Sequence, residues 1–298
     1  MYADSQTITI LIALVSAISR AGLNVSDRRL FGHIGVPVLL GSALNNVLPA
    51  IVGVTGCLLV FGKSPLGSCL FDVRVVIFAI LVQIISLLFG AAFRDCSVPA
   101  VIIFSKAPDL FIPLGIYLTA RTFNGMDYAF AVTTVVLCAP VVIEAISVKS
   151  NSPRHWLLLI ALMVTLQGSV SPILLKGTQF NVVMASSFTA ASLVWRLVTS
   201  FVLLAKPAKY SSTLPSVIVE KLPLHLWRGL LATLTQFTFV LALSRGNLAI
   251  AWPILNSTPL VAAVGSAVLL SEKPTRPELR ACIGILFVAL LKGLLSGR

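Results

Sequence analysis

Residues 104–113, FSKAPDLFIP, place a lysine and an aspartate inside an apolar stretch long enough to cross a membrane. A charge at the centre of a bilayer costs about 2.5–3.5 kcal/mol on insertion scales, so a charge that is kept there indicates function. Lys106 and Asp109 are three residues apart, on one helical face, where they can pair. The two prolines remove backbone donors and break or kink the helix. With Ser105, these residues predict a cationic centre for an anionic or zwitterionic ligand; the alternative is a self-neutralised pair that stabilises a kink.

A second polar stretch, WPILNST, lies at residues 252–258. Trp252 and Asn256 are four residues apart and therefore share a helical face. An indole ring beside a hydrogen-bonding amide suits a ring-bearing ligand, which makes both residues candidates for substrate binding. For Trp252, ordinary packing is the alternative.

Arg196 stands well inside the apolar segment SLVWRLVTS. An arginine at that depth must face the helix bundle or water. Two roles are open: Arg196 binds a carboxylate or phosphate through paired hydrogen bonds, or it pairs with Glu144. Glu144 lies about one helical turn inside its own apolar segment, where it is a proton-coupling carboxylate, an anchor at the interface, or the partner of Arg196.

Asn45 and Asn46, in GSALNNVLPA, form a third polar break beside a proline. Two amides in an apolar segment either contact a ligand or hydrogen-bond to a neighbouring helix, and both roles are open.

No pattern in the chain predicts catalysis. The nucleophile elbow, the zinc-protease motif and the phosphate-binding glycine loop are all missing from the sequence. The five cysteines form no C-x-x-C pair, so we expect no metal and no cofactor. The net charge of +12 comes from basic residues scattered between apolar runs, a pattern typical of membrane anchors rather than of a nucleic-acid surface.

The elements that must position these residues are membrane helices. The chain has 298 residues, of which 57% are hydrophobic and 11% charged, and its mean hydropathy is +1.00. Soluble domains are about one-quarter charged, whereas runs of about 20 uncharged residues are what a helix needs to cross a bilayer. The apolar runs predict an all-α protein with ten spans, at 7–25, 35–61, 73–93, 97–119, 127–148, 155–175, 182–204, 224–244, 247–270 and 278–295.

The ten spans divide into two halves of five, residues 1–149 and 150–298. At an offset of 151 residues, Arg94 matches Arg245 and Pro108 matches Pro259. Both halves have a short basic hairpin after the third span and a polar, proline-containing fourth span. Because five is odd, the second half enters the membrane in the opposite orientation. Inverted repeats of this kind are typical of transporters, whose substrate sites lie at the midplane.

The segment 243–293 resembles the closing spans of the drug/metabolite transporter superfamily, EamA-like branch. The resemblance rests on small and polar residues followed by a proline in the ninth span, on Glu272 at its end, and on Gly284 in the tenth. The segment 104–132 is similar to the nucleotide-sugar transporter branch, with a lysine before a proline in the fourth span and with a basic residue and a tyrosine around the loop that follows. The resemblance implies a ten-helix carrier with both termini in the cytoplasm.

We therefore expect a secondary transporter that moves a small polar metabolite, a nucleotide or phosphometabolite or an amino-acid-like zwitterion, by alternating access. Exchange or an ion gradient would supply the energy. We expect a bacterial inner membrane or an organelle membrane, a monomer or homodimer, and partners limited to the substrate and the lipid bilayer. An exporter of aromatic amino acids or amphipathic drugs, and a non-transporting membrane protein such as a lipid-handling enzyme or assembly subunit, are the alternatives. The orientation is open, because the loops opposite the termini hold more Lys and Arg than the positive-inside rule allows for cytoplasmic termini.

Overall fold

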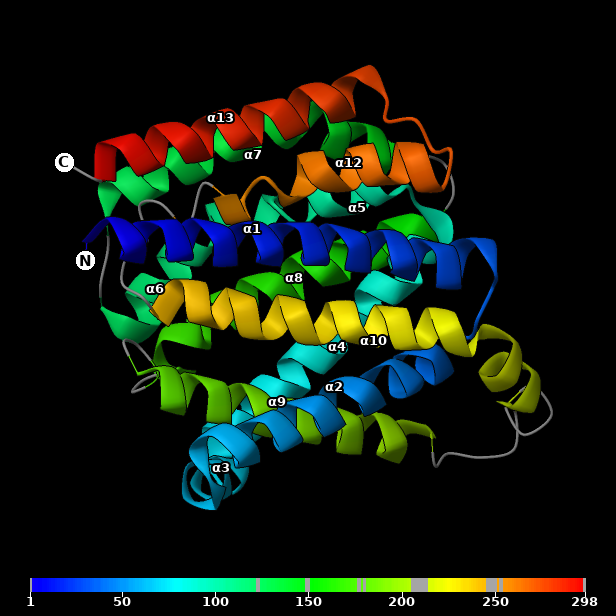
Figure 1. Cartoon of the computed structure of the whole chain (residues 1–298). Coiled ribbons are helices and arrows are strands. Elements are labelled where there is room, and N and C mark those ends of the chain that lie inside the picture. The colour runs from blue at the N-terminus through cyan, green and yellow to red at the C-terminus, as the bar shows by residue number, and fades with distance from the viewer. Residues whose placement is uncertain are drawn as a thin grey trace.

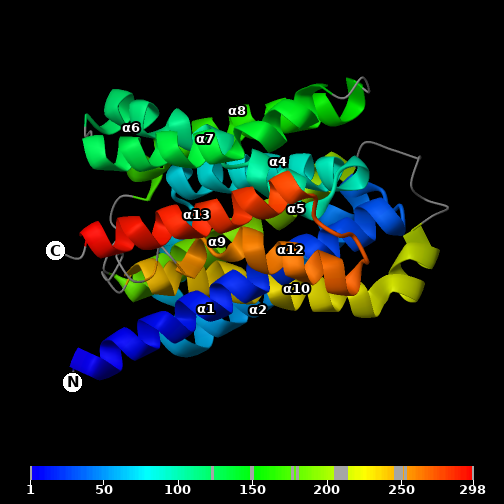
Figure 2. The same cartoon turned by 90° about the horizontal axis from the view of Figure 1, so that it is seen from above.

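The chain folds into a bundle of long helices (Figure 1). The computed structural model describes residues 2–121, 124–147, 151–175, 178, 181–204, 214–244, 251 and 254–296. All regular elements within these residues are helices, so the all-α prediction is confirmed. In both views α1 begins and α13 ends at the same end of the bundle, here called the termini end (Figures 1 and 2). The opposite end, where α1 ends and α13 begins, is called the far end.

The elements follow the apolar runs closely. In chain order they are α1 (Tyr2–Asp27), the π-helix η1 (Arg28–His33), α2 (Val38–Phe61), α3 (Lys63–Leu70), α4 (Val73–Asp95), α5 (Val98–Phe104), the 3₁₀-helix η2 (Ala107–Leu110), α6 (Ile112–Ala120), α7 (Gly125–Ser147), α8 (Asn151–Leu174), α9 (Val182–Leu204), α10 (Leu214–Ser244), α12 (Thr258–Leu269) and α13 (Arg276–Ser296).

Several of these helices are long and apolar enough to cross a membrane. Among the described residues there are 6: Thr7–His33, Val38–Phe61, Val73–Asp95, Val98–Gly115, Gly125–Glu144 and Val182–Leu204. The protein is therefore a multi-pass helical membrane protein, as the sequence predicted. The number of ten spans stays a prediction.

Two segments that the sequence predicted as loops are helical. Residues 63–70 form α3, because Leu66 and Cys69 are buried in a cluster with Phe188 of α9. Helix α10 begins at Leu214, well before the predicted start of its span at residue 224, and it continues through Pro223. Hydropathy places the membrane part of a helix but carries no signal for polar turns that extend it.

Local residues explain where the helices begin and end. Gly62, with φ of 76°, ends α2 in a conformation that favours glycine. Asp72 caps α4 by accepting a hydrogen bond from the backbone nitrogen of Arg74. Ser97 does the same for α5 by accepting from Ala100, and a proline follows in the first turn.

Helix α9 packs on α2, α3, α4 and α10. Its buried face consists largely of small residues, including Ala185, Ser186, Ser187, Ala190 and Ala191. Small side chains let neighbouring helices approach closely, which is the usual way that membrane helices pack. A Cβ added at Gly53 of α2 would meet Leu193 of α9 at 3.1 Å, so that contact is tight.

Most of the long helices pack against helices from the other half of the chain. Helix α1 packs on α10 and α12, while α8 packs on α4 and α6. Helix α2 packs on α10, and α9 packs on α4. Three further pairs join helices from the two halves of the chain: α2 with α9, α5 with α12, and α7 with α13.

Candidate functional site

The stretch 104–113 breaks the fourth predicted span, as its prolines predicted. Helix α5 ends at Phe104, residues 105–106 form a turn, and η2 and α6 continue the chain. The backbone tightens at the break: the nitrogens of Lys106 and Asp109 each bond a carbonyl three residues back, at 3.0 Å. Pro108, which is buried, lacks the donor that would continue the α-helix.

The second half of the chain breaks in the same way. Residues 256–257 form a turn, and α12 begins at Thr258, with Pro259 in its first turn. Ser257 donates to the carbonyl of Ile254, and Leu260 donates to Ser257, both at 3.0 Å. Each of these bonds has its counterpart at the matching position of the first break. The two stretches that the sequence analysis paired therefore share a backbone conformation as well as a proline.

A hydrogen bond joins the two breaks. The Nζ of Lys106 donates to the Oδ1 of Asn256 at 2.9 Å, in a half-buried position. The alternative of a self-neutralised pair between Lys106 and Asp109 is wrong, because among the described residues no ion pair joins them. The Lys106 ammonium donates to Asn256 of the other half instead.

Asp109 and Ser105 lie beside this contact in different roles. Asp109 is half-buried in η2 and interacts electrostatically with Lys106 and with Lys292 of α13. The hydroxyl of Ser105 donates to the carbonyl of Ile102 at 2.6 Å, so it caps the end of α5. We define the Lys106 junction as Ser105, Lys106, Asp109 and Asn256.

Arg196 belongs to a different group of residues, on α2, α4 and α9. Its Nε donates to the Oε1 of Gln83 at 3.3 Å. The Nδ2 of Asn46 donates to the same oxygen and to the hydroxyl of Ser200, both at 2.9 Å. The Nε2 of Gln83 donates to the hydroxyl of Ser42 at 2.9 Å, which completes a buried network. Asn46 therefore has the cross-helix hydrogen bonds that the sequence left open.

The alternative pairing of Arg196 with Glu144 is wrong. Glu144 is exposed on α7, whereas Arg196 is buried on α9 and bonds to Gln83. The two helices are not packing partners among the described contacts, so depth in the membrane alone was a poor guide to pairing.

Sequence reasoning missed a buried ion pair beside this network. Arg228 of α10 binds Asp27 at the end of α1 through its Nε at 2.8 Å and its Nη2 at 3.1 Å. His225, one turn earlier on α10, contacts the Oδ1 of Asn45 through its Nδ1 at 2.7 Å. Both Asp27 and Arg228 interact electrostatically with Arg196 and with His225. The signal that could have found them is the position of Arg228 inside a predicted span.

We use the name Arg196 cluster for the whole group. Its members are Asp27, Ser42, Asn45, Asn46, Gln83, Arg196, Ser200, His225 and Arg228. No hydrogen bond or ion pair joins this cluster to the Lys106 junction among the described residues. The sequence placed these residues in one predicted site. In the structure they form two separate polar groups.

Trp252 lies outside the described residues, so its role in substrate binding stays a prediction. Within the part of the chain that the structure describes, no three His, Cys, Asp or Glu side chains come together to hold a metal ion.

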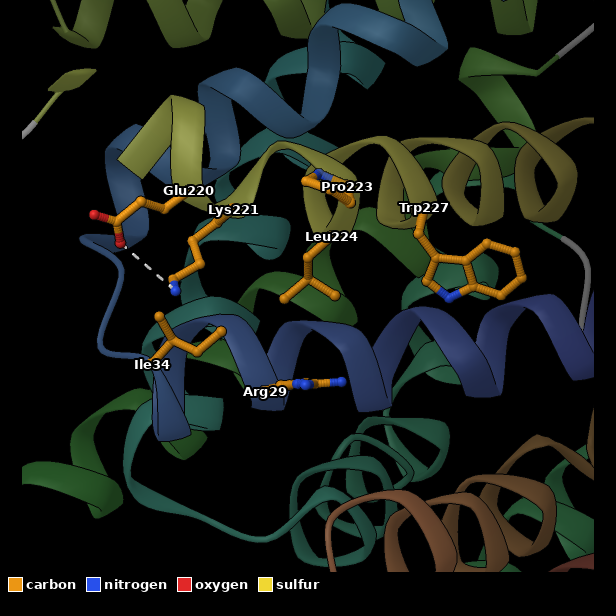
Figure 3. Close-up of a pocket in the computed structure, with 7 residues that line it drawn as sticks. All are labelled: Arg29, Ile34, Glu220, Lys221, Pro223, Leu224 and Trp227. Carbon is orange, nitrogen blue, oxygen red and sulfur yellow. Dashed lines mark ion pairs between the residues drawn. The ribbon is translucent and has the colours of Figure 1, made fainter. Parts of the chain in front are cut away.

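A surface pocket lies at the far end, and its lining includes α10 residues adjacent in sequence to His225 and Arg228 of the Arg196 cluster. It has a volume of about 450 Å³ and opens between the end of η1 and the start of α10 (Figure 3). The side chains of Arg29, Lys221 and Trp227 line it, and Lys221 pairs with Glu220 at 3.7 Å. A tryptophan with basic residues at a helix end is typical of the membrane interface.

Comparisons with known proteins bear on the fold. No family model and no curated protein matches the chain. Among solved structures 16 chains match. One of them, described only as the crystal structure of a protein, has a TM-score of 0.66 and 15% sequence identity, and the match covers 98% of this chain and 98% of that chain. At this identity the likeness shows the fold alone, but it extends over the full bundle.

Proposed function

We propose that this protein is a ten-pass secondary carrier of the inverted-repeat type, in a bacterial inner membrane. It moves a small polar metabolite that is anionic or zwitterionic, by alternating access, with energy from exchange or an ion gradient. The chain resembles the drug/metabolite transporter superfamily in the residues described above.

The packing of the helices supports the inverted repeat. If the five spans of the first half match those of the second, α1 corresponds to α8, α2 to α9, α4 to α10, the broken α5–α6 to α12, and α7 to α13. Several of the main contacts between halves then have counterparts: α1 on α10 matches α8 on α4, α1 on α12 matches α8 on α6, and α2 on α10 matches α9 on α4. The pairs α2–α9, α5–α12 and α7–α13 join equivalent helices, as contacts on a twofold pseudo-axis must.

The observation that carries the proposal is the hydrogen bond between Lys106 and Asn256. It joins two helix breaks that occupy matching positions in the two halves. In inverted-repeat carriers the substrate site lies at the repeat interface, and broken helices supply its polar groups. A lysine on one break and an amide on the other offer a cation and a hydrogen-bonding group to the same ligand.

The balance of charge favours an anionic group on the substrate. Arg20, Lys106 and Arg196 lie within predicted spans, and among the described residues none has a carboxylate at ion-pair distance. Arg20 instead stacks over the ring of Phe239, with 4.8 Å from its Cζ to the ring centroid. Buried cations are costly in a membrane unless they meet a counter-charge, which a bound anion supplies.

Uptake into proteoliposomes tests the proposal. The purified protein is reconstituted with a panel of radiolabelled nucleotides, phosphometabolites and amino acids, and exchange is measured for each. We expect at least one anionic or zwitterionic solute to exchange. Lys106→Gln should lower its uptake by roughly tenfold or more, because a charge-assisted contact is lost.

The matched control is Lys273→Gln, because Lys273 is exposed between α12 and α13. It removes the same charge and should leave uptake unchanged. Exchange of no solute would overturn the carrier function, and uptake that is equal in Lys106→Gln and in the wild type would overturn the assignment of the site.

A further inference from the structure

The guanidinium of Arg196 is buried and incompletely bonded. Arg196 is 6% exposed, and its guanidinium makes one hydrogen bond to the described residues, from Nε to Gln83. Its two terminal nitrogens bond to none of the described residues. Gln83 already accepts from Asn46, so the amide oxygen is shared between two donors. A buried arginine usually uses its planar fork of donors in full, and here the fork is unused.

The charges around Arg196 do not cancel. Arg228 and Asp27 form a two-bond ion pair with each other, and both side chains are buried. Arg196 lies near enough to interact electrostatically with that pair but forms no ion pair with it. Within the described part of the cluster, two arginines therefore face one carboxylate, which leaves one net positive charge.

Two further polar atoms in the cluster have no partner among the residues that the structure describes. The Nδ2 of Asn45 and the Nε2 of His225 are buried and make no hydrogen bond to any of those residues. The Oδ1 of Asn45 already accepts from the Nδ1 of His225, so the amide nitrogen is the free donor. Buried polar atoms in native proteins are almost always bonded, and an exception calls for a missing partner.

We propose that the Arg196 cluster binds a small oxyanion, a single carboxylate or an inorganic phosphate, on the fork of Arg196 and the amide of Asn45. Such an anion neutralises the excess charge and accepts from the donors that lack partners. The site is separate from the Lys106 junction. Binding there requires no transport, so the inference goes beyond the proposed carrier function and is tested apart from it.

Thermal unfolding of the purified protein in a neutral maltoside detergent tests the site. The melting temperature is measured against inorganic phosphate, with chloride at the same ionic strength as the reference. Phosphate should raise the melting temperature of the wild type in a saturable manner. Arg196→Gln should weaken phosphate binding roughly tenfold to a hundredfold, because contacts between a cation and an anion are lost.

Two matched variants define the specificity of the effect. Arg29→Gln removes an exposed arginine at the far end and should keep the phosphate response. Lys106→Gln should keep it as well, which separates this result from failure of the carrier proposal. If Arg196→Gln does not fold, Asn45→Asp replaces the free donor with a carboxylate and should abolish the response in a folded protein.

The source of the oxyanion is tested with short-chain phosphatidylglycerol in a parallel titration. A lipid headgroup should give a response that is independent of Arg196, because the side chain is too deeply buried for it. Four results would each overturn the proposal. Two concern phosphate and Arg196: no response of the wild type, or an equal response in the wild type and in Arg196→Gln. The other two are a phosphate response that is lost in Lys106→Gln, and a dependence on Arg196 that is seen with the lipid but not with phosphate.

Discussion

Ion pairs between helices stabilise both ends of the bundle, but the pairs at the two ends differ in how deeply they are buried. At the far end, Arg228 and Asp27 form an ion pair whose side chains are 5% and 10% exposed. At the termini end, Lys292 and Asp127 join α13 to α7 with side chains that are 27% and 43% exposed. Burial raises the free-energy cost of breaking an ion pair, because each separated charge is then left with neither water nor a partner.

A second set of contacts reinforces the far end. Arg28, just after α1, binds Glu272 at 2.7 Å and donates to the carbonyls of Phe93 and Arg94 at the end of α4. His33 contacts the same carboxylate at 2.9 Å. One carboxylate and one guanidinium thus tie together α1, α4 and the loop between α12 and α13.

Under the proposed carrier function, this difference predicts which end is closed in this conformation. Opening the far end would break buried charge contacts between distant parts of the chain, whereas opening the termini end would break exposed ones. We therefore propose that the far end is the closed end of this conformation. The following predictions test that contrast, from the largest expected effect to the smallest.

Arg228→Met should cause the largest loss of stability. It leaves Asp27 buried without its partner, which costs about 3–5 kcal/mol. The check is the melting temperature in detergent. The double variant Asp27→Asn with Arg228→Met should recover a large part of the loss, because the unpaired charge is then gone. A single variant as stable as the wild type would contradict the contrast between the ends.

Glu272→Gln should loosen the far end by about 1–3 kcal/mol, because Arg28 and His33 lose their shared carboxylate. Cys96, in the turn between α4 and α5, reports on this end. Burial, with the nearby Asp95, raises the pKa of its thiol to about 11, so the reactive thiolate is scarce at neutral pH. Maleimide labelling should be slow in the wild type, should speed up as pH rises, and should be about tenfold faster in Glu272→Gln.

Cys96→Ser is the control for that measurement. Among the five cysteines, the other four are buried, so the signal should vanish in the serine variant. Labelling at an equal rate in the wild type and in Glu272→Gln would show that the carboxylate does not hold the far end closed.

Asp72→Ala tests a local contact at the other end of the same helix, α4. Removing the cap should cost about 0.5–2 kcal/mol, and Asp72→Asn should keep most of it. The hydrogen bond from Arg74 lowers the pKa of Asp72 in the folded protein. Its ionic stabilisation is therefore fully present above the ordinary carboxyl pKa and is lost as pH falls through the lowered one. Melting temperatures recorded against pH should show this acid loss in the wild type but not in Asp72→Asn.

Asp127→Asn should have the smallest effect. Its ion pair with Lys292 is partly exposed, and such pairs contribute about 0–1 kcal/mol. The measurement is again the melting temperature, with added salt as a second variable, since screening should remove what little difference exists. A loss as large as that of Arg228→Met would make the two ends equivalent.

Local patterns predicted the helices and their breaks well. The stretch 104–113 was predicted to break because prolines remove backbone donors, and α5 ends at Phe104. The matching of Pro108 with Pro259 predicted a second break, which lies at residues 256–257. These features depend on residues a few positions apart, so sequence carries them. The helix at residues 63–70 was missed because its burial depends on α9.

Side-chain partners were predicted less well. The pairs Lys106–Asp109 and Arg196–Glu144 followed from spacing and from depth, and neither forms. Lys106 instead contacts Asn256 from the other half, and Arg196 contacts Gln83. Both true partners are more than a hundred residues away, where no periodicity connects them.

The sequence by itself determined that this is a helical membrane protein, where most of its helices lie, and which charges are too costly to be accidental. Hydropathy and proline act over one helical turn or one membrane thickness, so both can be read along the chain. Only the tertiary structure decided that the polar residues form two groups rather than one, and that Asp27 is bound by Arg228. Those outcomes depend on which helices pack together, and packing is set by side chains far apart in the chain.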